Sequence, residues 1–311
     1  MCSRAEAQRP CYPTARDCVE DSPELEVALK GIALISSAAQ LRQELAARSA
    51  AYATSRELPH VCTYSERPVI VYEPCADGQR HGNFLDASYR AILRNPAWIR
   101  RLEKVHTNAA RSLPRSDRRW RELDSCMSSD ALLMNVFCHP RTLRSRALCA
   151  TLGIGTGESP VFGFRARVPL ANGHSDRTEV DMKLGSLLVE AKLSESDFQS
   201  QATDVVGSYR DLHEVFECRL LPKVRDRYAC YQLIRNVLAA HALDLSFCVV
   251  LDARRPDLVE SWYSVMRCVR NATLRTRCQV LTWQELSDGL PSEVRQFLKN
   301  KYAVYKSAAK R

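Results

Sequence analysis

The segment that decides the fold is TEVDMKLGSLLVEAKL, residues 178–193. Apolar and polar side chains alternate on both sides of Gly185-Ser186, a pattern typical of two β-strands joined by a tight turn. A two-residue turn of type II′ needs a positive φ at its first residue, and glycine adopts that φ without strain. The segment therefore predicts a β-hairpin with its turn at Gly185-Ser186.

Counting outward from this turn gives the register of the hairpin. It pairs Asp181 with Glu190, whose Cβ atoms would then lie about 4.5–5.5 Å apart. Because side chains alternate along a strand, Lys192 falls on the same face as Glu190. We expect the two acids and the lysine on one face and the core on the other. The expected core face is apolar throughout and consists of Val180, Met182, Leu184, Leu187, Val189, Ala191 and Leu193.

Two facing carboxylates beside a lysine suggest metal-assisted chemistry. Like charges this close raise a pKa unless a cation intervenes, and carboxylates suit Mg²⁺ or Mn²⁺, which keep positions for water and a substrate phosphate. Lys192 would then hold or deprotonate the attacking water, which points to phosphodiester hydrolysis. The alternative is an edge hairpin whose solvent face pairs Glu179 with Lys192. Asp181-x-Lys183 has the same spacing as Glu190-x-Lys192, but only the latter has an acid facing it.

The rest of the chain alternates between helical and strand patterns. Asn95-Pro96 and Ser128 are typical helix starts, and Ser196-x-x-Gln199 resembles a capping box in front of a helix over 198–216. These segments predict an α/β core in which an antiparallel hairpin feeds parallel strands. The expected helices lie within 23–52 and over 84–93, 96–105, 128–137, 198–216, 228–243, 257–269 and 292–302; the other expected strands cover 68–72, 161–168, 247–251 and 279–283.

Composition divides the chain into three parts. Residues 1–22 lack periodicity and predict a poorly ordered leader. Residues 23–125 predict a mainly helical N-terminal region, and residues 126–311 predict the α/β core. Thirteen scattered cysteines without a C-x-x-C spacing argue against a zinc ribbon or a disulfide framework and for reduced thiols. Seven histidines without metal-binding spacing weaken the case for a histidine-built metal site.

The chain is basic, with 45 Lys plus Arg against 36 Asp plus Glu, a net charge of +9 and a pI near 9.0. Basic clusters at 100–101, 111–121, 141–146, 223–227 and 299–311 point to a polyanionic partner, with solvated surfaces as the alternative. No apolar stretch approaches the roughly 18 residues of a membrane span, and the N-terminus lacks the apolar region of a secretory signal. We expect no membrane and a cytoplasmic location.

At the hairpin, the sequence resembles the PD-(D/E)xK nuclease superfamily, whose pattern is an Asp on one strand and Glu-x-Lys on the next. More narrowly, it resembles a family of restriction-endonuclease-like proteins over most of the chain after about residue 80. The resemblance implies a restriction-endonuclease-like core plus an N-terminal helical region. Val180 stands where the signature has proline, a mild departure. Besides the hairpin, the resemblance rests on Gly82-Asn83-Phe84 to Lys104-Val105-His106, Ser128 to Leu132 with Asn135, Tyr231 to Asn236, Leu281-Thr282-Trp283 and Lys301-Tyr302.

The resemblance also implies roles for single residues. Asp181, Glu190 and the carbonyl of Ala191 would hold Mg²⁺, and Lys192 would position the attacking water. Asp130 is the acidic residue on the first core helix and a weaker candidate for a metal ligand. Gln232 and Arg235 lie off the apolar stripe of their helix, where they would reach the site or a phosphate, or else face solvent.

The hypothesis is a Mg²⁺-dependent endonuclease that cuts DNA, with basic clusters supplying affinity for the backbone. One alternative is a catalytically inactive module of the same fold that binds nucleic acid. Another is a helical interaction protein built on residues 23–106; the predicted hairpin argues against this alternative. The sequence leaves the oligomeric state open, and a homodimer is how many nucleases of this shape cut both strands.

Overall fold

The computed structural model describes residues 36–63, 69–105 and 120–306. The described residues from Ser37 onward belong to one compact unit. The predicted leader, the first part of the predicted N-terminal helices and the basic cluster at 111–119 lie outside the described residues.

The centre of the fold is a five-stranded mixed sheet in the order β12-β11-β7-β6-β3. The β3–β6 and β6–β7 pairs are antiparallel, and β11 pairs in parallel with both β7 and β12. The predicted α/β class, with an antiparallel hairpin feeding parallel strands, is therefore confirmed. The five strands are β3 (Pro160–Arg165), β6 (Glu179–Leu184), β7 (Leu187–Ala191), β11 (Ser246–Leu251) and β12 (Cys278–Thr282).

The β6–β7 hairpin has the predicted register from its turn as far as Met182 and Val189, where the ladder ends, so the predicted pair of Asp181 with Glu190 is not part of it. Leu184 pairs with Leu187 and Met182 with Val189. Gly185 has a φ of 57°, whereas Ser186 is not among the residues with positive φ, so the turn has the φ signs of type II′. A Cβ at Gly185 would lie 2.8 Å from the carboxyl carbon of Glu158, so space as well as backbone conformation favours glycine here.

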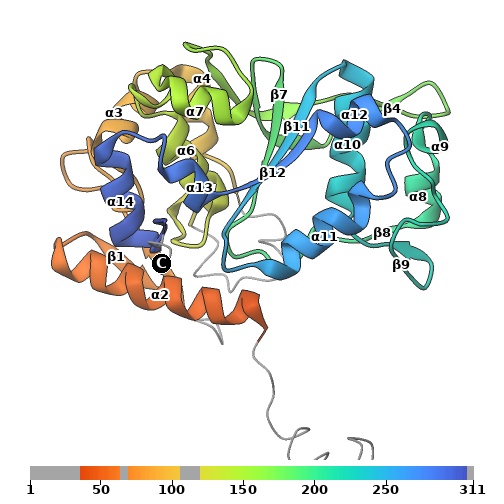
Figure 1. Cartoon of the computed structure of the whole chain (residues 1–311). Helices are drawn as coiled ribbons and strands as arrows, with labels where there is room; N and C mark the ends of the chain where they lie inside the picture. Colours follow the sequence, from red (N-terminus) through yellow and green to blue (C-terminus); the bar gives the residue numbers. More distant parts are fainter. Residues whose placement is uncertain (1–35, 64–68, 106–119, 307–311) are drawn as a thin grey trace, which may run out of the picture. The chain divides into compact units, whose positions relative to one another are not determined.

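Helices cover both faces of the sheet (Figure 1). On one face, α10 (Tyr231–Leu243) and α11 (Pro256–Met266) pack on Leu188 and Val249. On the other face, α6 (Ser129–Phe137), α14 (Ser292–Tyr302) and α2 (Ser37–Ser55) share a core with Met182, Val189 and Val250. The remaining helices of these layers are η3 (Thr142–Arg144), α7 (Arg146–Leu152), α9 (Leu212–Val215), α12 (Ala272–Thr276) and α13 (Trp283–Ser287).

The N-terminal part of the described chain contributes helices and one small sheet. The predicted strand over 68–72 is β2 (Ile70–Tyr72), which pairs with β1 (His60–Cys62). Helices α3 (Asp86–Leu93) and α4 (Pro96–Leu102) follow as predicted, and the Asn95 side chain accepts the Ala97 amide at 3.0 Å. A short 3-10 helix, η2 (Glu122–Asp124), leads to α6, whose N-cap is Ser128.

The prediction of a single helix over 198–216 was wrong. The segment forms β8 (Gln201–Ala202), α8 (Thr203–Gly207) and α9. Gln199 has a φ of 59°, and β8 pairs with β10 (Arg227–Tyr228), which also pairs with β9 (Lys223–Val224). These strand pairings satisfy backbone groups that a continuous helix would have bonded internally, while Phe198, Val206 and Phe216 still reach the core.

The expectation of one core face and one open face was wrong for β7, because all five of its residues are buried. Helix α10 covers the face on which Leu188 and Glu190 lie, so this face is also part of the core. Val180 packs in the α10 cluster as well, apart from Met182. Opposite Asp181 in the neighbouring β3, Gly163 has a φ of 63°. Two short strands, β4 (Val168–Pro169) and β5 (Ser175–Asp176), lie between β3 and β6 in the chain.

Candidate active site

The structure brings Asp181, Glu190 and Lys192 together at the carboxyl end of β7; we call these residues the acid–lysine site. Oδ2 of Asp181 accepts the Ala191 amide at 2.8 Å, and Nζ of Lys192 donates to Oε1 of Glu190 at 2.8 Å. Glu190 is 2% exposed and Lys192 4%, whereas Asp181 keeps part of its surface open to solvent. One carboxylate is therefore buried in an ion pair, and the other lies at the surface of the site.

Backbone geometry places the Ala191 carbonyl beside Asp181. In the parallel β7–β11 pair, the Lys192 amide donates to Val250 at 2.8 Å, so Ala191 directs its own amide and carbonyl away from β11. The bond from the Ala191 amide to Asp181 agrees with this direction. The β6–β7 ladder ends at Met182 and Val189, so the Ala191 carbonyl lies beyond the paired residues of the hairpin.

A residue that the sequence analysis did not assign, Asn236 on α10, completes the surroundings of Glu190. Its Nδ2 donates to Oε2 of Glu190 at 2.9 Å, and its Oδ1 accepts Arg235 Nη2 at 2.8 Å. Arg235 also donates to the Glu179 carbonyl at 2.8 Å. A signal for Asn236 was present, because it lies four residues after Gln232 and therefore on the same helix face.

Gln232 lies one helical turn before Asn236 on α10. Its Oε1 is buried and has no hydrogen-bond partner among the described residues, and the same holds for Nε and Nη1 of Arg235. Such groups cost free energy unless water or a ligand meets them. The catalytic role of Gln232 stays a prediction.

Asp130 lies in the first turn of α6, in an ion-pair cluster next to the acid–lysine site. Its Oδ2 accepts Arg101 Nη2 at 2.8 Å and Lys104 Nζ at 2.6 Å. Arg101 also donates to Glu179 at 2.8 Å, and it lies over Gly163, where a Cβ would come within 2.5 Å of its Nη1. Two cations therefore compete with any metal ion for Asp130, and its role as a metal ligand stays a prediction.

Glu195 is a second residue that the sequence analysis did not assign. It follows β7, and its two carboxylate oxygens accept Ser129 Oγ at 2.5 Å and the Leu193 amide at 2.7 Å. The buried Arg255 donates to the Glu195 carbonyl, which holds this loop in place. The charge of Glu195 adds to that of Glu190 in raising the pKa of Lys192.

The pKa values of Asp181 and Lys192 are both raised, but for different reasons. Burial raises the pKa of Asp181 well above its ordinary value, and the negative charges of Glu190 and Asp130 raise it further. Burial alone would lower the pKa of Lys192, but the charges of Glu190, Glu195 and Asp181 more than offset this, so its pKa is raised. The site therefore has excess negative potential at Asp181 and a lysine that stays protonated, which is an arrangement that a cation would stabilise.

The donor set fits Mg²⁺ better than a transition metal. In the part of the chain that the structure describes, no group of three or more His, Cys, Asp or Glu side chains is arranged to hold a metal ion. Mg²⁺ needs only one or two carboxylates, because waters and substrate phosphates complete its shell. Asp181 supplies one such carboxylate, whereas Glu190 already accepts Lys192 and Asn236.

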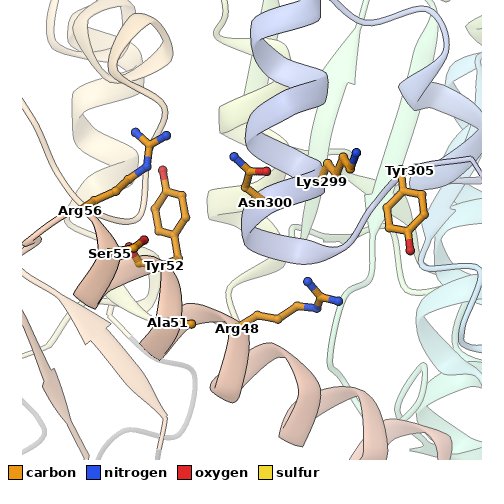
Figure 2. Close-up of a pocket in the computed structure, with 8 residues that line it drawn as sticks. All are labelled: Arg48, Ala51, Tyr52, Ser55, Arg56, Lys299, Asn300 and Tyr305. Carbon is orange, nitrogen blue, oxygen red and sulfur yellow. The ribbon is translucent and has the colours of Figure 1, made fainter.

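A separate pocket lies between α2 and α14 (Figure 2). Its volume is about 810 Å³. Three cations line it, Arg48, Arg56 and Lys299, and none of the predicted site residues does. Both helices end at this pocket, so the cations there balance the negative C-terminal ends of the helices.

The described residues also bear on two other predictions, which concern the cysteines and membrane-spanning helices. Every cysteine that the structure describes is a free thiol, as predicted. The expectation that these thiols are buried holds for half of them, since Cys62 is exposed and four are partly buried: Cys75, Cys218, Cys230 and Cys278. None of the helices in the described ranges is long and apolar enough to span a membrane.

Comparison with known proteins gives one match. No curated protein and no solved structure matches the chain significantly. A family model described as "Restriction Endonuclease associating with ARP" matches residues 50–303, which include the whole sheet, the acid–lysine site and both helical layers except the first part of α2. The protein therefore belongs to this restriction-endonuclease family.

Proposed function

We propose that the protein is a Mg²⁺-dependent endonuclease with a restriction-endonuclease-like core that hydrolyses phosphodiester bonds of DNA. The main support is the position of Asp181, which accepts the Ala191 amide next to the buried Glu190–Lys192 pair. The family name implies a nuclease and a DNA substrate. The net charge of +9 suits a polyanionic substrate.

Each residue of the acid–lysine site, and each of its neighbours on α10, has a distinct role in this proposal. Asp181, Glu190 and the Ala191 carbonyl would hold the ion, which when bound activates water and offsets charge on the phosphate. Lys192 orients the attacking water and offsets charge on the phosphate as the P–O bond breaks. Asn236 holds Glu190 in one orientation, and Arg235 holds the Asn236 amide so that its Nδ2 faces Glu190.

The negative potential at the site supports metal dependence. Without a cation, the pKa of Asp181 is raised, so its carboxyl group tends to take up a proton. A divalent ion that neutralises this potential lowers that pKa and is itself bound through the same interaction. We therefore expect Mg²⁺ to raise the melting temperature of the protein, and Asp181→Asn to abolish that rise.

Conversion of supercoiled plasmid to nicked and linear forms tests the proposal. Wild type is expected to cleave in Mg²⁺ and not in EDTA, and Asp181→Asn and Glu190→Gln are expected to lose cleavage. Glu260→Gln, an exposed acid on α11, is the matched control and should cleave at the wild-type rate. Cleavage that survives both site substitutions would contradict the proposal.

One observation favours a second candidate, a binding module of the same fold without catalysis. Both Glu190 oxygens already have donors, Lys192 and Asn236, so this carboxylate is neutralised without a metal. This candidate predicts DNA binding that needs no metal, together with absence of cleavage in Mg²⁺ or Mn²⁺. Single- and double-stranded substrates in the same assay would test both candidates.

A further inference from the structure

A basic β-hairpin precedes α10 and has no part in the proposed chemistry. It consists of residues 223–227, with β9 paired to β10 through Arg227 and Val224. Lys223, Arg225 and Arg227 are exposed, and none has a carboxylate partner among the described residues. Val224 is 66% exposed at the tip of the same hairpin. We call residues 223–227 the basic hairpin.

The basic hairpin is fastened to the loop that leaves the acid–lysine site. Nη2 of Arg227 donates to the Ser200 carbonyl at 2.7 Å, and the Tyr231 amide donates to the Gln199 carbonyl at 2.9 Å. Two residues earlier than Ser200, the Phe198 ring lies 5.6 Å from Lys192 Nζ. Figure 1 shows β8 and β9 beside α8, on the same side of the sheet as α10 and α11. The hairpin is therefore held in a set position relative to the site.

The turn of the basic hairpin has an arginine, Arg225, at a position whose positive φ favours glycine or asparagine. The register leaves Arg225 and Asp226 as the two turn residues, and Arg225 has a φ of 55°. Glycine or asparagine adopts this conformation at lower cost than arginine. Nζ of Lys223 lies 4.2 Å from the centre of the ring of the buried Tyr228, so a cation–π contact holds this ammonium group on the hairpin while the residue stays exposed. The hairpin thus presents positive charge at some cost to turn stability.

We propose that the basic hairpin contacts the phosphate backbone of double-stranded DNA beside the acid–lysine site. This inference rests on the proposed function, since it assigns the substrate contact of the same site. Exposed cations without carboxylate partners match the charge of phosphates, and a two-stranded ribbon of this size fits the major groove of a duplex. The pocket of Figure 2 matches a polyanion less well, because two helix C-termini face it.

Equilibrium binding to a labelled DNA duplex in EDTA tests the proposal without cleavage. The double substitution Lys223→Ala with Arg225→Ala should weaken binding roughly tenfold or more and lower the slope of log K against log salt by about 1–2. Arg227 is left in place because it holds Ser200. Arg90→Ala with Arg94→Ala is the matched control, since these exposed arginines lie at α3, which packs on α6 on the side of the sheet opposite α10.

Arg225→Gly separates binding from stability. Glycine suits the positive φ of the turn, so this variant should weaken binding severalfold without lowering the melting temperature. Equal affinities of wild type and the hairpin variants would overturn the inference, as would a larger loss in the control pair or in Arg56→Ala with Lys299→Ala. Tighter binding to a single strand that ignores the hairpin substitutions would also overturn it.

Failure of the inference and failure of the proposed function give different results. If the protein binds DNA through the hairpin and cleaves nothing in Mg²⁺, the inference stands and the proposed catalysis falls. If it cleaves in Mg²⁺ and the hairpin variants bind and cleave as wild type does, the catalysis stands and the inference falls.

Discussion

Two lysines are almost fully buried in this protein, and their surroundings are opposite. Lys192, in the acid–lysine site, donates to a carboxylate, Glu190. Lys301, on α14, donates to the Gly82 carbonyl at 3.0 Å and to Asn83 Oδ1 at 2.6 Å, which are neutral acceptors. Four aromatic rings also lie within 5.6 Å of its Nζ; they belong to Tyr52, Tyr72, Phe297 and Tyr302. We call this second region the Lys301 junction.

The difference shows how a buried lysine can serve chemistry or assembly. Burial lowers the pKa of Lys301 well below its ordinary value, and the charge of Cys126 opposes this shift. Asn83 joins the junction to α6, since Asn135 Nδ2 donates to the Asn83 carbonyl at 3.0 Å. Three segments that the family resemblance singles out therefore meet at a structural contact and not at the acid–lysine site.

The largest expected effect comes from the same substitution at both lysines. Lys192→Met should lower the rate of plasmid cleavage in Mg²⁺ by roughly 10² to 10⁴, because it removes the group that orients the attacking water. Lys301→Met should leave the rate of cleavage within about threefold. It should lower the free energy of unfolding by about 1–2 kcal/mol, because the Gly82 carbonyl and Asn83 Oδ1 lose their hydrogen-bond donor. Denaturant unfolding gives the second quantity. Equal losses of activity at the two lysines would remove the distinction between the regions.

A smaller effect is expected at Asn236, which connects α10 to the acid–lysine site. Asn236→Ala leaves Oε2 of Glu190 without its donor, so we expect cleavage in Mg²⁺ to fall roughly 10- to 100-fold. Asn300→Ala, an exposed asparagine on α14, is the control and should cleave normally. The Mg²⁺ concentration for half-maximal rate should rise in Asn236→Ala, whereas a purely structural role would leave it unchanged.

The smallest effect is a difference in pH dependence at the Lys301 junction. A lysine whose folded-state pKa is lowered binds fewer protons in the folded state than in the unfolded state. The free energy of unfolding therefore rises with pH from the lowered pKa up to the ordinary value of 10.5, by at most about 1.4 kcal/mol per pH unit. Lys301→Met should remove this rise, as seen in unfolding curves between pH 6 and about 9. A wild-type slope that persists in the variant would mean that Lys301 stays charged.

Local patterns predicted the parts of the fold that depend on neighbouring residues. The hairpin followed from alternation and from Gly185, and the starts of α4 and α6 followed from Asn95 and Ser128, whose side chains make the expected caps. The same reasoning failed over 198–216. The apolar residues there have helical spacing, but the backbone of β8 pairs with β10 instead of continuing as a helix. It also placed the start of α10 at Tyr228, although Tyr228 is in β10 and Cys230 has a φ of 57°.

The candidate site divides in the same way. Asp181, Glu190 and Lys192 were predictable because a two-residue turn transmits register along a hairpin. Asn236, Arg101 and Glu195 were not assigned, because their contacts depend on how α10, α4 and the loop after β7 pack. The possible homodimer, the cytoplasmic location and the three-part domain division stay predictions.

The sequence alone determined which residues could meet across one tight turn, because backbone geometry sets that register within a few residues. Only the tertiary structure decided what surrounds them. Burial of β7 on both faces, the amide of Asn236 on Glu190 and the cations on Asp130 come from packing between segments far apart in the chain. Such packing depends on the shape of the whole core, which no local pattern contains.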